Sequence, residues 1–490
     1  MDNKSLKEKT ITSMLWSGIG KFGTLGLQLI SNIVLARLLL PKDFGAIGML
    51  NIFIAVSGIL VTAGFGSALI QKKEPSQVDY NSVFYWNLSA SIVLYIILFF
   101  SAQSISDFYS IPILTPILRV QSLSLIIQAF STIQSNILQK ELQFKELSIR
   151  NVTSALAGTV IAIAMAYSGF GVWSLVANNI VSNIAGVILL WKMSPWRPTK
   201  DFSWTSLKEL FPFGSLIAIS SLVETIYTNI QGLIIGKWYS ATDLGLYTQA
   251  MKLESVPTDS LSQIVNQVSF PVFSKLQDDK QQLLNGVRKN VKAITYLNFP
   301  LMVLLIIIAE PLITLLFGEK WLASIPYFQI LCISGMVYTL NTLNTNVIKS
   351  LGKGKVYFFV QLSKRLVGIA LILIGLNYGI FGLLWSVTSV GYICLFINMG
   401  VNKRLINYGY IKQIKDVGGY YLLSLATGGA TYLLCKGIQL NSYLVMLIEI
   451  FLYLAIYILA SRLTNAEGYI TYKQILLNIR YLNNNSKMNN

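Results

Sequence analysis

Histidine is absent from all 490 residues. Its absence excludes histidine-ligated zinc sites, Ser-His-Asp triads and histidine proton relays. Cysteine occurs three times (Cys332, Cys394 and Cys435), always in an apolar run and without a CxxC pair. We interpret these cysteines as helix-packing residues. Charged residues make up 12% of the chain, about half the share usual in a soluble domain. No polar stretch is long enough to form such a domain.

Hydrophobic residues, in contrast, make up 54% of the chain, and the mean hydropathy is +0.59. Apolar runs of about 20 residues are long enough to cross a bilayer as helices. We therefore expect an all-α polytopic membrane protein with about fourteen transmembrane helices. The expected spans lie near residues 11–36, 45–70, 82–103, 113–138, 148–168, 171–191, 209–236, 245–272, 290–317, 325–348, 356–376, 380–401, 417–436 and 442–461.

The distribution of cations predicts the orientation. The N-terminal residues lack the short apolar region and small-residue cleavage site of a removed signal peptide. With the N-terminus in the cytoplasm, 28 of the 38 lysines and arginines fall in cytoplasmic segments. Outer segments hold only Arg37, Lys42, Lys237, Lys320 and Lys436. This asymmetry predicts a multi-pass protein of the bacterial inner membrane with both termini cytoplasmic. It also accounts for most of the net charge of +17 without a nucleic-acid partner.

The chain repeats itself at a spacing of about 200–214 residues. "LLPKDFGAIG" (39–48) matches "YSATDLGLYT" (239–248), which aligns Gly45 with Gly245. Further matches follow in the same order: "SIP" at 110–112 and 324–326, residues 133–158 with 343–368, and "GFGVWSLV" with "GIFGLLWSV". An even number of spans in each repeat predicts two parallel six-helix repeats around a central cleft, followed by two extra helices.

The predicted domain boundaries follow from these repeats. We expect an N-terminal lobe (1–205), a C-terminal lobe (206–405), the two additional helices (406–465) and a cytoplasmic tail (466–490).

The first hairpin, "LARLLLPKDFGAIGMLNIF", and the second-half segment "GKWYSATDLGLYTQAMKL" resemble the MOP exporter superfamily. Within it, nearly the whole chain is similar to the Wzx-type polysaccharide-transport flippases. The resemblance implies a transporter and not an enzyme. Its expected activity is to move an undecaprenyl-diphosphate-linked oligosaccharide from the inner to the outer leaflet by alternating access. It also implies surface polysaccharide biosynthesis (O-antigen, capsule or exopolysaccharide), with glycosyltransferases and a polymerase as partners.

Cations inside the predicted spans are the candidate site. They are Lys21, Arg119, Lys252, Lys364 and Arg365, with Arg37 near the outer end of the first span. In hydrocarbon each would cost about 2.5–3.5 kcal/mol. Arginine and lysine bind phosphate oxygens, so these residues are candidates for contacting the substrate diphosphate. Lys364 is expected near mid-bilayer, and Arg365 lies about 100° away around the helix.

The alternative for each cation is structural, because a lysine or arginine can reach the interface or pair with an acid. Glu224 is a candidate for binding a coupling Na⁺ or proton, or for pairing with a cavity cation. We assign no catalytic residue, no metal site and no cofactor beyond that coupling ion.

Three other functions are alternatives to this one. A MATE-like multidrug exporter would favour an acidic, aromatic cavity. A lipid II flippase carries the same diphosphate, so the charges do not discriminate against it. A glycosyltransferase or polymerase would need a polar active-site loop or paired acids near the interface. The outer segments are short, and their acids are widely separated.

Overall fold

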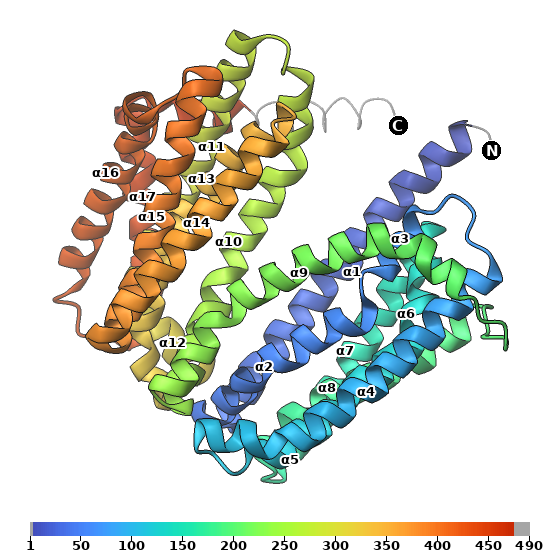
Figure 1. Ribbon diagram of the computed structural model, residues 1–490. Helices are drawn as coiled ribbons and strands as arrows, with labels where there is room; N and C mark the ends of the chain where they lie inside the picture. The colour runs from blue at the N-terminus through green and yellow to red at the C-terminus, as the bar shows by residue number, and fades with distance from the viewer. Residues whose placement is uncertain (1–2, 475–490) are drawn as a thin grey trace, which may run out of the picture. The chain divides into compact units, whose positions relative to one another are not determined.

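The computed structural model describes residues 3–474, and these residues form helices without any strand (Figure 1). The chain divides into two compact units, residues 1–248 and 249–490.

The first unit contains nine helices and the start of a tenth. Its helices are α1 (Asn3–Leu38), α2 (Pro41–Thr62), α3 (Phe65–Gln71), α4 (Gln77–Tyr109), α5 (Leu114–Gln121), α6 (Leu123–Lys140), α7 (Phe144–Tyr167), α8 (Trp173–Met193) and α9 (Trp204–Trp238). The first turns of α10 (Ala241–Lys275) also belong to it. Helix α7 packs on α1 and α8, while α9 packs along α2, α3 and α4.

Aromatic and aliphatic side chains form a core at one end of this unit. Phe65, Leu69, Phe84, Ile133 and Trp196 are buried together, and they come from α3, α4, α6 and the segment before α9. The rings of Phe84 and Trp196 meet edge to face at 5.7 Å between centroids. Edge-to-face ring pairs of this kind contribute about 0.5–1.5 kcal/mol each beyond the area that they bury.

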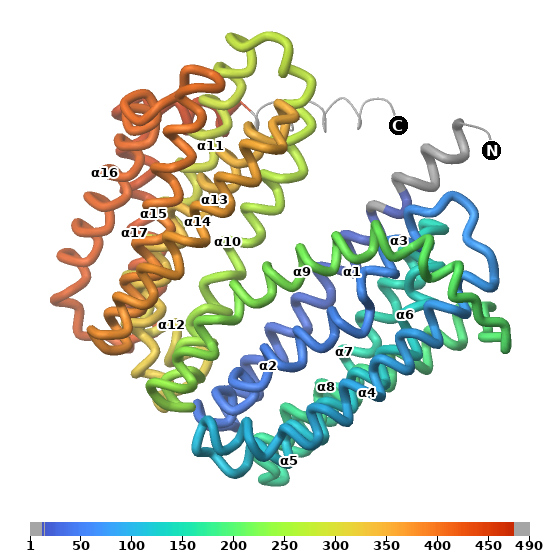
Figure 2. Tube along the Cα trace, in the orientation of Figure 1, coloured from blue at the N-terminus to red at the C-terminus, as the bar shows by residue number. Residues whose placement is uncertain are grey.

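In the second unit, α13 is a largely buried helix around which the others pack. Its elements after α10 are α11 (Lys280–Ile307), α12 (Ala309–Phe317), η1 (Glu319–Ser324), α13 (Ile325–Ser350), α14 (Gly354–Gly375), η2 (Leu376–Tyr378), α15 (Gly379–Ile406), α16 (Tyr410–Cys435) and α17 (Ser442–Leu463). Helix α13 packs on both α11 and α15, and α15 also packs on α14. Their traces can be followed in Figure 2.

The predicted all-helical membrane architecture is confirmed. Eleven stretches of residues 3–474 are long and apolar enough to cross a membrane. One of them, Gly354–Ile406, contains both α14 and α15, so these stretches account for twelve of the fourteen predicted spans. Helices α10 and α16 occupy the positions of the other two, but they are less apolar and are not among the eleven.

Several predicted spans are interrupted. The run 45–70 is divided between α2 and α3 at Ala63 and Gly64, whose φ angles are 45° and 72°. These left-handed conformations end the first helix, and glycine adopts them at little cost. The run 113–138 is divided between α5 and α6, and the run 290–317 between α11 and α12.

The repeat and the compact units divide the chain at different places. The repeat assigns α9 to the second half of the sequence, whereas its contacts place it in the first unit. A repeat reflects sequence similarity and a compact unit reflects contacts. The domain boundary at 205/206 therefore stays a prediction.

Candidate functional site

The predicted site residues of the first unit lie on three helices. Lys21 and Arg37 are exposed on α1, sixteen residues apart, which corresponds to about 24 Å along the helix. Glu224 is exposed on α9. Arg119 on α5 is half-buried, and its Nε donates to the carbonyl oxygen of Phe99 at 3.2 Å.

The guanidinium of Arg119 also lies 4.5 Å from the centroid of the Phe99 ring. A cation over an aromatic face is held electrostatically. Arg119 is therefore anchored to α4, which fits the structural alternative for this residue.

In the second unit, Lys364 is the buried member of the predicted set. Its exposed fraction is 8%, while Lys252 on α10 is exposed and Arg365 on α14 is half-buried. On α14 the buried positions Val360, Lys364, Gly368 and Ile372 recur every four residues. They form one stripe of α14, the helix that packs on α15. The ammonium of Lys364 lies within electrostatic reach of Cys394 on α15 and Lys349 on α13.

Glu254 on α10 is a buried carboxylate of the same unit. Thr258 Oγ1 donates to Glu254 Oε1 at 2.5 Å. The carboxylate fits against α13 because position 335 is glycine: a β-carbon there would lie 2.2 Å from Oε1. Among the ion pairs between described side chains, none involves Glu254. The sequence places Glu254 at membrane depth, but it gives no sign of this helix contact.

Buried amides join α13, α15 and α16. Asn402 Nδ2 donates to Asn344 Oδ1 at 2.7 Å, and Gln413 Nε2 donates to the same oxygen at 3.0 Å. One turn away, Asn398 Nδ2 donates to Asn341 Oδ1 at 2.8 Å. Hydrogen bonds of this kind hold membrane helices in register. The spacing of Asn341 with Asn344, and of Asn398 with Asn402, was the available sequence signal, because each pair shares a helix face.

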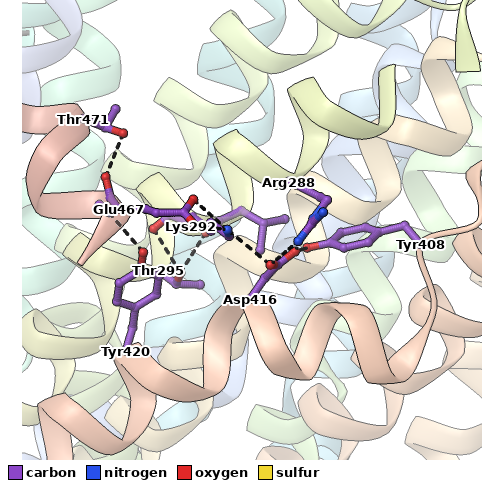
Figure 3. A network of polar contacts seen from close by, with 10 residues as sticks. Arg288, Lys292, Thr295, Tyr408, Asp416, Tyr420, Glu467 and Thr471 are labelled. Atoms are coloured by element: carbon purple, nitrogen blue, oxygen red, sulfur yellow. Dashed lines mark hydrogen bonds and ion pairs between the residues drawn. The ribbon is translucent and has the colours of Figure 1, made fainter. Parts of the chain in front are cut away.

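A network of charged and polar side chains lies near the beginning of α16 (Figure 3). Arg288 on α11 donates to both carboxylate oxygens of Asp416, at 2.7 and 2.8 Å. The Tyr408 hydroxyl donates to Asp416 Oδ2 at 2.9 Å, and Lys292 Nζ lies 3.4 Å from Asp416 Oδ1. Burial and the neighbouring Asp416 carboxylate raise the pKa of Tyr408, so this phenol stays a hydrogen-bond donor.

The network continues into the segment after α17. Lys292 Nζ also contacts Glu467 Oε2 at 2.6 Å. The Gly468 N–H donates to the Tyr420 hydroxyl at 3.0 Å, and Tyr472 donates to the Ala293 carbonyl oxygen at 3.2 Å. Residues 467–474 are thus a helical segment docked on α11 and α16. They were predicted as part of a cytoplasmic tail, and the rest of that tail lies outside the described residues.

The first unit also contains a group of ion pairs, centred on Lys72. Lys72 contacts Asp79 at 2.9 Å and Glu209 at 3.2 Å, which links the α3–α4 connection to the beginning of α9. Hydrogen bonding to Asp79 raises the pKa of Lys72. Among the side chains that the structure describes, there is no group of three or more Cys, Asp or Glu that could hold a metal ion.

Comparison with protein families decides the assignment. The family described as "Polysaccharide biosynthesis protein" matches residues 34–326, which is more than half of the chain. The chain belongs to this polysaccharide biosynthesis protein family.

Three proteins of known name are similar to this chain over most of their length. The lipopolysaccharide biosynthesis protein WzxC of Escherichia coli (strain K12) is 27% identical over 90% of each chain. The succinoglycan biosynthesis transport protein ExoT of Rhizobium meliloti (strain 1021) is 27% identical over 79% of this chain and 80% of its own. The teichuronic acid biosynthesis protein TuaB of Bacillus subtilis (strain 168) is 25% identical over 72% and 74%.

Solved structures confirm the fold of this polysaccharide biosynthesis protein. A lipid II flippase, MurJ, superimposes with a TM-score of 0.73 at 17% identity, covering 91% of this chain and 99% of that one. A multidrug resistance MATE family transporter of the MOP superfamily gives a TM-score of 0.61 at 14% identity, covering 81% and 98%. The predicted resemblance to MOP exporters is confirmed, and the chain is a membrane transporter and not an enzyme.

Proposed function

We propose that this transporter is a flippase for undecaprenyl-diphosphate-linked oligosaccharide. It moves this lipid from the cytoplasmic to the outer leaflet of the bacterial inner membrane by alternating access. The product serves surface polysaccharide biosynthesis (O-antigen, capsule or exopolysaccharide). Glycosyltransferases supply the substrate, a polymerase consumes the product, and both termini are cytoplasmic.

The observation that carries this proposal is the similarity to three named polysaccharide biosynthesis proteins along most of the chain, one of them described as a transport protein. Their named polysaccharides differ, which favours a cargo defined by its lipid carrier over one defined by a particular sugar.

Cations at membrane depth support a diphosphate cargo. Ionised phosphates are costly to move through hydrocarbon, and fixed cations lower that cost. We assign this role to Lys21, Arg37, Lys252, Lys364 and Arg365, and also to Arg119 if it releases Phe99 during transport. Lys364 is the leading residue, because a lysine at 8% exposure on an otherwise apolar stripe is expensive to keep.

A carboxylate is the proposed site of ion coupling. Glu224 is the candidate for binding Na⁺ or a proton, since a carboxylate on a membrane helix can hold either one.

The test is leaflet orientation in liposomes that contain the purified protein. A fluorescent undecaprenyl-diphosphate oligosaccharide is added to both leaflets, and a membrane-impermeant quencher reports the outer fraction. We expect protein-dependent exchange between the leaflets. Liposomes that contain denatured protein are the control.

Two other cargoes are measured in the same liposomes. Movement of lipid II but not of the oligosaccharide lipid would replace the proposed cargo with a peptidoglycan precursor. Uptake of a fluorescent organic cation, with neither lipid moved, would support a drug exporter and overturn the flippase proposal.

A further inference from the structure

Four exposed cations surround the connection between α15 and α16. Lys403 and Arg404 lie in the last turn of α15, and Lys412 and Lys415 lie in the first two turns of α16. Only residues 407–409 join the two helices, so all four cations lie at one end of the second unit (Figure 1). These four residues form the α15–α16 rim.

No acidic side chain neutralises the rim. The sequence has no aspartate or glutamate from residue 320 to residue 415. Asp416, the next acid along the chain, is buried and already bonded to Arg288 and Tyr408. The ion pairs formed by described side chains include none of the rim cations. The rim therefore presents positive charge that the described part of the chain does not compensate.

Helix stability explains only half of this charge. Cations stabilise the C-terminal end of a helix and are unfavourable at its N-terminal end. Lys403 and Arg404 fit this rule, but Lys412 and Lys415 lie at the beginning of α16. Lys412 Nζ donates to the Asn407 carbonyl oxygen at 3.0 Å, which holds its charge beside the end of α15. The two lysines thus bring positive charge to a place where the helix alone favours an acid.

Exposed apolar side chains lie next to the rim. The Tyr410 hydroxyl lies against Gly400 of α15, where a β-carbon would be 2.4 Å from that oxygen. The Tyr410 ring packs on Phe396, with centroids 6.1 Å apart. Phe396 and Ile414 are 48% and 49% exposed. Phe396 precedes Lys403 by about 10 Å along α15. Cations and apolar side chains are therefore successive levels of one surface.

The connection fixes the stem of one rim side chain. A β-carbon at Gly409 would lie 2.9 Å from both Cβ and Cγ of Lys403, so this stem lies directly against the connection. A side chain that is already ordered loses less conformational entropy when it binds a ligand.

We propose that the α15–α16 rim binds anionic phospholipid of the cytoplasmic leaflet. Its phosphodiester lies among the four cations, where the Arg404 guanidinium and the lysine ammonium groups bind the oxygens. Its acyl chains run along Phe396, Tyr410 and Ile414. Clusters of four or more cations beside a membrane helix attract anionic lipid. A lipid with a choline headgroup fits less well, because choline adds a positive charge to the rim.

The leaflet follows from the proposed orientation, in which the α15–α16 connection is cytoplasmic. The lipid preference itself depends neither on that orientation nor on the proposed cargo. If the protein moves no lipid-linked oligosaccharide but retains anionic phospholipid at the rim, the proposed cargo fails and the rim stands.

Site-specific quenching tests this surface. Ile414→Cys carries a bimane fluorophore, in full-length protein with Cys332, Cys394 and Cys435 changed to serine. The protein is reconstituted without cargo into phosphatidylcholine vesicles that contain an equal small fraction of brominated phosphatidylglycerol or brominated phosphatidylcholine. We expect the phosphatidylglycerol to be enriched about threefold or more at this reporter, and less so at high salt. Equal quenching by the two lipids would overturn the proposal and favour an acidic protein partner.

A second reporter measures the preference away from the rim. Ile149 is exposed in the second turn of α7, as Ile414 is in the second turn of α16. We expect the two brominated lipids to quench a bimane at Ile149→Cys nearly equally. The same enrichment at both reporters would mean a general attraction to the protein and would overturn a specific rim.

Charge removal identifies the residues responsible. Changing all four rim cations to glutamine is expected to abolish the enrichment at the Ile414→Cys reporter. Lys412→Gln with Lys415→Gln keeps the stabilising cations of α15, and we expect it to lower the enrichment by about twofold. The control changes four exposed cations of the first unit to glutamine: Lys73, Lys192, Lys200 and Lys208. Enrichment that persists in both rim variants, or is lost equally in the control, would overturn the proposal.

Discussion

Arg288 and Asp416 form a two-point ion pair between α11 and α16, with both carboxylate oxygens accepting from one guanidinium. This geometry is the strong form of a protein ion pair. The pair joins α16, one of the two helices that follow the repeats, to α11, which belongs to the second repeat.

Asp416→Asn is expected to destabilise the second unit. The Asp416 side chain is only 4% exposed, and its loss of charge leaves Arg288 without its carboxylate. Because Arg288 retains access to water, we expect the free energy of unfolding to fall by about 2–3 kcal/mol. Thermal unfolding in detergent measures the change, and Asp278→Asn at an exposed position is the control. Equal melting temperatures for Asp416→Asn and wild type would contradict a stabilising pair.

Gly468→Ala is expected to release the docked segment 467–474. A β-carbon at position 468 would lie 2.5 Å from the Tyr296 ring, which is packed against Tyr420 and Tyr472. Hydrogen–deuterium exchange in 467–474 should therefore accelerate by about tenfold or more. Gly429→Ala on α16 is the control, since a β-carbon there meets nothing within 4 Å. Unchanged exchange in Gly468→Ala would mean that the segment tolerates the added atom.

Lys364→Met separates a functional from a structural lysine. Methionine fills a similar volume without the charge, so a structural role predicts equal or greater stability together with normal transport. We expect normal stability and a transport rate lowered by about tenfold or more, because the diphosphate loses a cation. The leaflet assay measures the rate, and Lys355→Met in the first turn of α14 is the control. Wild-type transport would remove Lys364 from the site.

Glu224→Gln tests ion coupling. If Glu224 binds the coupling ion, the neutral amide is expected to abolish the response of transport to an imposed Na⁺ or proton gradient. The gradient is imposed across the same liposomes, and Glu449→Gln on α17 serves as the control. A gradient response equal to that of wild type would exclude Glu224 from coupling.

Asn344→Leu is expected to loosen α13 from α15 and α16. The change removes the oxygen that accepts from both Asn402 and Gln413. Each of these amides keeps one backbone acceptor, the carbonyl oxygen of position 344 or of Tyr408, so one N–H hydrogen of each is left unpaired. The expected cost is about 2 kcal/mol. Urea titration of the detergent-solubilised protein measures it, with Asn285→Leu at an exposed position as the control. A cost below that of the control would show that the donors find other acceptors.

The sequence predicted the helical spans well, because a run of apolar residues of bilayer length leaves few alternatives. It missed the break at Ala63 and Gly64, because the glycines of "LVTAGFGSAL" are also common inside packed membrane helices. The docked segment 467–474 was also missed. Its partners, Tyr296 and Tyr420, lie on other helices, and a polar composition alone is typical of a tail.

For the candidate cations, too, the sequence predicted the depth in the membrane but not the contacts of the side chains. Membrane depth follows from position along the span, and the sequence predicted it for Lys364. Which neighbour a side chain meets depends on packing, so the burial of Lys364 on the stripe of α14 and the contact of Arg119 with Phe99 required the structure.

The docking of Glu467 on Lys292 has a consequence for biosynthesis. The two residues are 175 positions apart. At ordinary synthesis rates, the ribosome makes Lys292 about 9–35 s before it makes Glu467. During that interval the part of α11 around Lys292 and Tyr296 lacks both the ion pair with Glu467 and the ring contact with Tyr472 that later cover it. A chain whose synthesis stops before residue 467 therefore leaves this part of α11 uncovered.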